Sequence, residues 1–248
     1  MNAKSWATRI GWMALFAAIV GAGLMFAGAT RVRFAGDADK LAGFSWVPLG
    51  MMIAAGALLL ALVALIWRFA GKRGSARSGV LALIVAGIPL GWVVAQIVSA
   101  GDAPAIHDVT TDLGDPPAFA ALPLAEDNLR GVETEEKWRE LHARAYADIE
   151  PLVVGAPVDQ VIAEAASLAR DKGWNVASSN AASGAMEATA TVSYYRFKDD
   201  VVLRVSDMGN GRSRVDMRSV SRVGISDLGY NAARIREFLA DLDARLEG

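Results

Sequence analysis

Three long apolar runs without a charged residue fill most of the first hundred positions, and short segments of mixed polarity follow them. The uncharged runs cover residues 10–30, 41–67 and 78–101. Each reaches or exceeds the roughly 20 apolar residues with which an α-helix crosses a hydrocarbon core. A helix at the surface of a soluble protein would instead carry polar residues along its outer face. The pattern therefore predicts three transmembrane helices.

The first run also has features of a cleaved signal peptide. Lys4 and Arg9 precede it, and Ala27-Gly28-Ala29 resembles a cleavage site with small residues. The run is longer than the apolar region of about 7 to 15 residues that signal peptides use, which favours a span. Whether the first run is cleaved or retained, the two later spans are unchanged. The chain therefore ends on the same side of the membrane.

The short flanks of the spans predict the orientation. Lys and Arg residues near span ends are retained on the cytoplasmic side. Residues 101–124, beyond the third span, contain no Lys or Arg. We therefore expect an integral protein of the bacterial inner membrane, with a cytoplasmic N-terminus and a periplasmic C-terminal domain. The basic residues before the first span and between the second and third are Lys4, Arg9, Arg68, Lys72, Arg73 and Arg77.

The part after the spans begins with a segment rich in proline and aspartate. Four of the eight prolines lie within residues 101–124, together with Asp108, Asp112 and Asp115. Proline fixes φ and removes a hydrogen-bond donor, so this composition predicts an extended tether with solvated acids. The predicted organisation is a membrane anchor at 1–100, a tether at 101–124 and a soluble domain at 125–248.

Hydrophobic periodicity divides the soluble domain into helices and strands. Their order predicts an α+β fold, in which an antiparallel sheet has helices packed on one face. The helices are expected at 133–145, 157–172 and 226–246, and the strands at 149–154, 174–177, 186–194, 200–206 and 212–223.

The last two strands are expected to form a hairpin around Gly209-Asn210-Gly211. If Ser206 faces Arg212, Val201 lies opposite Met217 and Asp200 lies opposite Arg218. The apolar residues then share one face, as a half-buried sheet requires.

Several motifs of the soluble half resemble one known family. They are His107-Asp108-Val109-Thr110-Thr111-Asp112, Asp115-Pro116-Pro117, Phe197-Lys198-Asp199-Asp200-Val201 and the run from Arg218 to Gly229. Together they resemble the family catalogued as domain of unknown function number 1499, from about His107 to the end of the chain. The resemblance implies a fold and a domain boundary, and it brings no activity or catalytic residues with it.

Charge and composition exclude several classes of function. Residues 1–100 carry nine basic and two acidic residues, whereas the remainder carries 16 and 25. An acidic domain does not suit nucleic acid. The chain has no cysteine, which excludes thiolate metal sites and cysteine nucleophiles. The predicted spans contain no charged residue, so we expect an anchor and not a transport path.

The candidate binding surface is a cluster of arginines on the sheet face opposite the helices. Arg204, Arg214 and Arg218 are expected there, and guanidinium groups suit carboxylates or phosphates. The partner would be an anionic envelope component or an acidic protein segment, which could be the tether of this same chain. The alternative is that this face is simply solvated and that Asp200, Asp216 and Glu187 pair with the arginines. The full candidate set is Arg204, Arg214, Arg218, Arg222, Asp199 and Asp200.

No metal or cofactor is expected. His107, Asp108, Asp112 and Asp115 lack the ligand spacing of a calcium loop, and His142 is predicted to be exposed on a charged helix. The sequence favours a non-enzymatic, membrane-anchored binding or scaffold domain whose partners include the lipid bilayer. The alternative is an envelope enzyme, with catalytic residues drawn from the region of Asp199, Asp200, Arg218 and Arg222. A transporter subunit is a third possibility.

Overall fold

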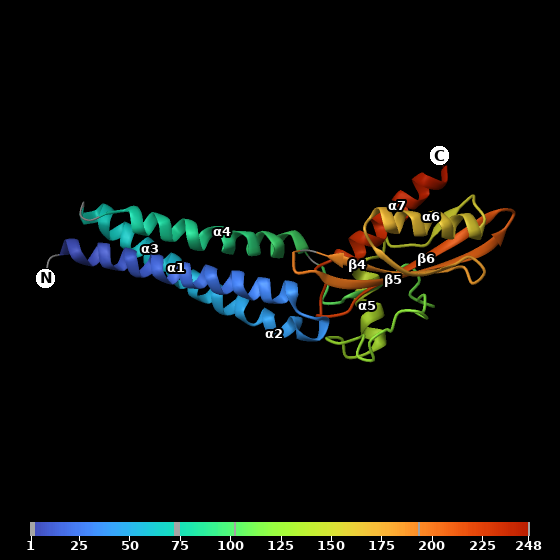
Figure 1. Cartoon of the computed structure of the whole chain (residues 1–248), viewed down its shortest axis with the longest axis horizontal. Helices are drawn as coiled ribbons and strands as arrows, with labels where there is room; N and C mark the ends of the chain where they lie inside the picture. The colour runs from blue at the N-terminus through green and yellow to red at the C-terminus, as the bar shows by residue number, and fades with distance from the viewer. Residues whose placement is uncertain (1–2, 72–74, 102, 193, 248) are drawn as a thin grey trace. The chain divides into compact units, whose positions relative to one another are not determined.

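The computed structural model describes residues 3–71, 75–101, 103–192 and 194–247. The chain divides into two compact units, Met1–Gly101 and Asp102–Gly248. Figure 1 shows long helices in the first unit and a sheet with helices in the second. Lys72 and Arg73 of the predicted basic turn lie outside the described residues.

The first unit contains the three predicted spans. Its helices are α1 (Ala3–Phe34), α2 (Lys40–Phe44), α3 (Trp46–Gly71) and α4 (Arg77–Ala100), with a short 3-10 turn at Asp37–Asp39. The candidate spans among the described residues are Trp6–Phe34, Lys40–Gly71 and Arg77–Ala100. All three are long and apolar enough to cross a membrane, which confirms the prediction of three apolar helices.

Small residues allow α1 and α3 to approach closely. A Cβ atom on Gly21 would lie 2.7 Å from the backbone nitrogen of Ala54, and one on Gly50 would lie 2.6 Å from the carbonyl oxygen of Gly21. Close backbone approach through small residues is the usual packing of helices in lipid. The buried positions alternate in steps of three and four: Gly11, Ala14, Ala18, Gly21, Met25, Gly28 and Val32 in α1, and Val47, Gly50, Ala54, Ala57, Ala61 and Ala64 in α3.

The second unit is an antiparallel sheet with helices, as predicted. The strand order is β1-β6-β5-β4-β3, and β2 also pairs with β6. Figure 1 shows α6 and α7 on one face of the sheet, with α5 away from them. The strands are β1 (Asp108–Thr110), β2 (Leu152–Val154), β3 (Asn175–Asn180), β4 (Ala185–Val192), β5 (Phe197–Gly209) and β6 (Arg212–Ser221), and the helices are α5 (Glu135–Ala145), α6 (Val158–Asp171) and α7 (Tyr230–Glu247).

The core lies between the sheet and helices α6 and α7. Alternate residues of β5, Val201, Leu203 and Val205, point to this side because successive side chains of a strand face opposite ways. They pack with Met217 of β6 and with α7 residues that include Phe238, which is fully buried.

The predicted register of the β5–β6 hairpin is wrong by two residues. Val201 pairs with Ser219 and Leu203 with Met217, whereas Val201 was expected opposite Met217. The cause is that β5 continues to Gly209, with a bulge between Asp207 and Gly209, while the prediction started the turn at Asp207. A shift of two keeps every side chain on its predicted face, because the period of a strand is two.

Strand β1 was not predicted, and its sequence was assigned to the tether. Asp108 pairs with Val220 and Thr110 with Arg218, at the edge of the sheet. The free side of this strand is covered by α5: the Thr110 N–H donates to His142 Nε2 at 3.1 Å, and Trp138 Nε1 donates to the Asp108 carbonyl oxygen at 2.9 Å. These contacts satisfy an edge strand that would otherwise expose polar backbone groups.

Candidate functional site

The predicted arginines do share the sheet face opposite α6 and α7. On β5 and β6, Arg204 pairs with Asp216, Ser206 with Arg214 and Val202 with Arg218. Arg222 follows β6 on the same face, where its guanidinium reaches Thr189 Oγ1 at 3.2 Å and Asp200.

Residues 111–130, here called the covering segment, lie over this face. The Glu187 carboxylate of β4 accepts hydrogen bonds from the backbone N–H groups of Ala120 and Ala121 at 2.8 and 2.9 Å, and from Leu122 at 2.7 Å. Glu187 is 3% exposed and Asp216 is 1% exposed. The alternative of a solvated sheet face is therefore wrong at Glu187 and Asp216, because both side chains are buried. Its expectation that Asp216 pairs with arginines is confirmed.

The acidic groups that meet the arginines come largely from the segment predicted as a tether. Arg204 contacts Asp112 at 3.3 Å and Asp115 at 2.7 Å, and Arg214 contacts Asp112 at 3.1 Å. Asp216 adds contacts of 3.5 Å to Arg204 and 3.0 Å to Arg214. The acidic partner of these arginines in the structure is thus a part of the same chain.

The predicted pairing of Asp200 with Arg218 is wrong, because of the two-residue register shift. Asp200 instead contacts Arg222 at 2.8 Å, and Arg218 contacts Asp108 at 2.6 Å. Each Asp200 oxygen accepts from Arg222, and Oδ1 also accepts from Thr189 Oγ1 at 2.7 Å.

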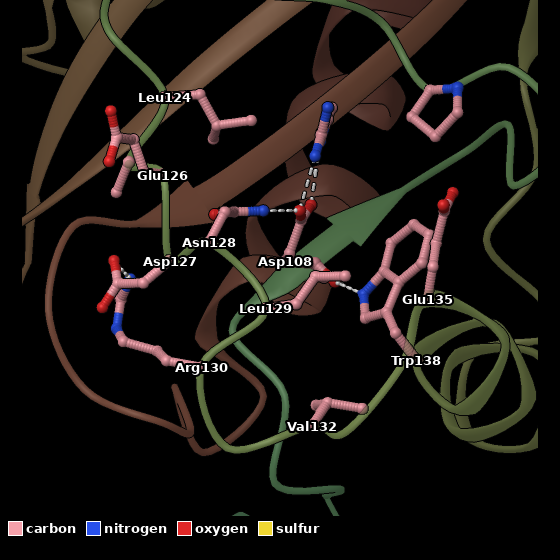
Figure 2. A pocket seen from close by; sticks show the side chains of 13 residues that line it. Asp108, Leu124, Glu126, Asp127, Asn128, Leu129, Arg130, Val132, Glu135 and Trp138 are labelled. Atoms are coloured by element: carbon pink, nitrogen blue, oxygen red, sulfur yellow. Dashed lines mark hydrogen bonds and ion pairs between the residues drawn. The ribbon is translucent and has the colours of Figure 1, made fainter.

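Asp108 is the centre of the site, and sequence reasoning missed it. Its side chain is 1% exposed, contrary to the prediction that the tether acids are solvated. Its carboxylate accepts hydrogen bonds from Arg218 Nε at 2.9 Å and Nη2 at 2.6 Å. It also accepts from the Asn128 amide, which points toward it in Figure 2. A two-pronged arginine–carboxylate contact fixes both groups in orientation as well as in charge.

A pocket of about 550 Å³ lies over this ion pair. Its wall combines apolar side chains of the covering segment with Trp138 of α5, as Figure 2 shows. Asn128 also lines it, although the side-chain carbonyl oxygen of this residue is buried and has no hydrogen-bond partner among the described residues. The lining residues are Asp108, Pro116, Leu124, Ala125, Glu126, Asp127, Asn128, Leu129, Arg130, Val132, Glu135, Trp138 and Arg218.

A second pocket, of about 300 Å³, lies over the Asp200–Arg222 pair. It shares Leu124, Ala125 and Asn128 with the first pocket. The structure thus brings Arg218, Arg222 and Asp200 to two adjoining hollows beneath one segment.

Asp199 does not belong to this site. It faces the other side of the sheet, where Arg234 of α7 contacts it at 2.6 Å. Arg234 also donates to Ser219 Oγ at 2.8 Å, and Ser219 donates to Asn231 Oδ1 at 2.6 Å. Asp199 and Asp200 are adjacent in sequence but are separated by the sheet, as alternation along a strand requires.

Both histidines are buried near β1. His107 is 2% exposed and His142 is 1% exposed, so the prediction of an exposed His142 is wrong. Burial lowers the pKa of each imidazole, because a charged ring is poorly solvated there. Among the described residues, no group of three or more His, Cys, Asp or Glu side chains is placed to hold a metal ion.

The apolar helices and the site together define a class: a membrane-anchored protein with an α+β domain whose sheet carries paired arginines under a covering segment. Residues 108–242 match the family described as "Protein of unknown function (DUF1499)", and the chain belongs to this family. This confirms the resemblance seen in the sequence. A search of curated proteins finds no match.

Proposed function

We propose that the second unit is a non-enzymatic binding domain, which the membrane helices hold on the extracytoplasmic side. The observation that carries this proposal is the pocket of about 550 Å³ over the Asp108–Arg218 pair. Its lining combines six apolar residues with seven polar or charged ones, and ligand sites likewise join apolar surface to polar groups that fix the orientation of the ligand. The Arg218 guanidinium, which also lines the pocket, offers such a ligand a positively charged hydrogen-bond donor.

The arrangement of the carboxylates favours binding over acid–base catalysis. Two carboxylates that act together must face one substrate, and one of them must be kept protonated. Asp199 and Asp200 face opposite sides of the sheet, and an arginine contacts each of them, at 2.6 and 2.8 Å. Of the four residues in the enzyme alternative, Asp200, Arg218 and Arg222 line the two pockets and Asp199 does not.

An external acidic partner, whether an anionic envelope component or a protein, would compete with the covering segment. Such a partner would replace Asp112 and Asp115 on Arg204 and Arg214, whose side chains are 31% and 40% exposed. Ion pairs that are this exposed contribute only about 0 to 1 kcal/mol each to stability. An external acidic group can therefore replace Asp112 and Asp115 at a small cost in free energy.

The proposed side follows from the basic flanks of the spans. Arg68 and Arg77 lie at the adjoining ends of α3 and α4, and Arg9 lies near the start of α1. Because basic flanks are usually retained in the cytoplasm, they support an orientation with the N-terminus inside and the second unit outside.

Native mass spectrometry of the full chain, extracted in mild detergent, tests the binding proposal. Ala125 lines both pockets and is exposed, so Ala125→Trp introduces a bulky ring at both of them without altering an ion pair. Ala143→Trp, at an exposed position of α5, is the matched control. We expect a bound small mass on the natural chain and on Ala143→Trp, and its loss from Ala125→Trp. A ligand-free natural chain, or equal retention by Ala125→Trp, would contradict the proposal.

A further inference from the structure

Exposed apolar and aromatic side chains gather at one end of the sheet of the second unit. Tyr194 is 45% exposed in the turn between β4 and β5. The loop after β6 contains Ile225 and Leu228, exposed at 57% and 46%, and Tyr230, the first residue of α7, is 43% exposed. The two segments lie at the same end, because the Arg222 N–H donates to the Lys198 carbonyl oxygen at 3.0 Å. Residues 194–198 and 225–230 are here called the apolar end.

The backbone of the apolar end adopts a costly conformation at two places. Arg196 has φ 55° and Leu228 has φ 56°. The third described non-glycine residue with positive φ, Asn210, is of a type that tolerates this region. Glycine would occupy positions 196 and 228 with less strain. Leu228 is both strained and exposed, so the unit itself gains little from this side chain, and a contact outside the unit would account for it.

The apolar end is closely connected to the third span through the covalent chain. Ser226 Oγ donates to the Pro104 carbonyl oxygen at 3.4 Å, and a Cβ atom on Gly229 would lie 3.5 Å from Cβ of Ala103. Ala103 is three residues beyond Ala100, where helix α4 ends. Three residues extend over about 10 Å at most, which is comparable to the depth of the headgroup layer.

The residue types of the apolar end suit that layer. The segment Tyr194-Tyr195-Arg196-Phe197-Lys198 combines three aromatic with two basic side chains. Tyrosine is enriched at membrane–water interfaces, where its ring lies among the lipids and its hydroxyl in water. Lys and Arg extend toward lipid phosphates. We propose that the apolar end inserts into the headgroup layer of the bilayer, so that the second unit itself binds the membrane surface.

Nitroxide-lipid quenching of single fluorescent labels tests this contact in the full chain. The natural chain has no cysteine, so one introduced thiol carries the label. The test positions are Leu228→Cys and Tyr194→Cys. The matched control is Met208→Cys, which is 51% exposed near the β5–β6 turn at the other end of the sheet. Each variant carries an environment-sensitive dye and is placed in lipid nanodiscs with nitroxide groups near the lipid phosphates.

We expect a blue shift and strong quenching at positions 194 and 228, and neither at position 208. Replacing Ile225 by Ser in the Tyr194→Cys variant should reduce the quenching at position 194. Quenching at 194 and 228 no stronger than at 208 would overturn the proposal. A blue shift without lipid quenching would also overturn it, since it would indicate a second copy or another protein on this surface.

Discussion

The interface between the helices of the first unit consists mainly of Ala and Gly, whereas the second unit buries ion pairs on both faces of its sheet. In the first unit Ala14, Ala18 and Ala54 are fully buried. In the second unit Asp199 and Asp108 are each 1% exposed and are held by arginines. The difference follows from the solvent: helices in lipid gain from close contact, while a domain in water can retain buried charges only if each one is paired.

This comparison predicts that removing one buried charge causes the largest effect. Asp199→Ala leaves Arg234 buried without its carboxylate, and such a change costs about 3 to 5 kcal/mol. Hydrogen exchange of β5 and β6 amides in the full chain measures the loss. The control is Asp148→Ala, which removes an exposed pair with Arg236 and should cost about 0 to 1 kcal/mol. If the two variants lost the same stability, burial of an ion pair would not decide how much the removal of one partner costs.

In the first unit, adding a single methyl group at a close helix contact should have the next largest effect. Gly50→Ala would place a Cβ atom 2.6 Å from the Gly21 carbonyl oxygen, so α1 and α3 must separate. Overpacking of this kind costs about 1 to 3 kcal/mol. Gly56→Ala, in the same helix with no atom within 4 Å, is the control. In thermal unfolding in detergent, the melting temperature should fall for the variant at position 50 only. An equal fall for both variants would contradict the close contact between α1 and α3.

Acid should destabilise the second unit through its buried histidines. Burial lowers the pKa of His142 below the 6.5 that it has when unfolded. The contribution of neutral His142 to folding stability is therefore fully present above pH 6.5. It is lost as the pH falls from 6.5 toward the lower pKa of the folded state. His142→Gln retains an acceptor for the Thr110 N–H without titrating in this range. Melting temperatures between pH 8 and pH 5 should fall less for this variant than for the natural chain. If the melting temperatures of His142→Gln and of the natural chain fell equally, His142 would not contribute to the acid sensitivity.

The smallest effect is expected where the ion pairs are partly exposed. Asp112→Asn weakens the contacts to Arg204 and Arg214, at a cost of up to about 1 kcal/mol. Hydrogen exchange should become faster in residues 112–122 while the β5 amides stay protected. As a control, Asp171→Asn alters an exposed pair with Arg245 in another part of the unit. Unchanged exchange in residues 112–122 would show that these pairs do not hold the covering segment.

The features that depend on local periodicity were predictable, and those that depend on pairing between distant segments were not. The three spans and the helices of the second unit follow from runs and stripes of apolar residues. The faces of Arg204, Arg214 and Arg218 followed from alternation, but their partners did not. Strand β5 continues to Gly209 with a bulge after Asp207, and together these put the register two residues away from the predicted one.

The position of β1 was hidden by the composition around it. Prolines and aspartates indicated a solvated tether, yet Asp108 is buried by Arg218 and Asn128, which lie 110 and 20 positions away in sequence. His142 lies on a charged helix, and its burial depends on β1, with which it forms a hydrogen bond. The one signal in the sequence was the cluster of arginines in an acidic domain, since unpaired arginines of this kind require nearby carboxylates.

We propose that the three spans hold the second unit outside the cytoplasm, and thiol labelling in intact cells tests this orientation. The natural chain has no cysteine, so Ala143→Cys and Ser75→Cys each carry the only thiol. A maleimide that does not cross membranes should label position 143 in intact cells and position 75 only after permeabilisation. Labelling of position 75 but not of position 143 in intact cells would contradict the account.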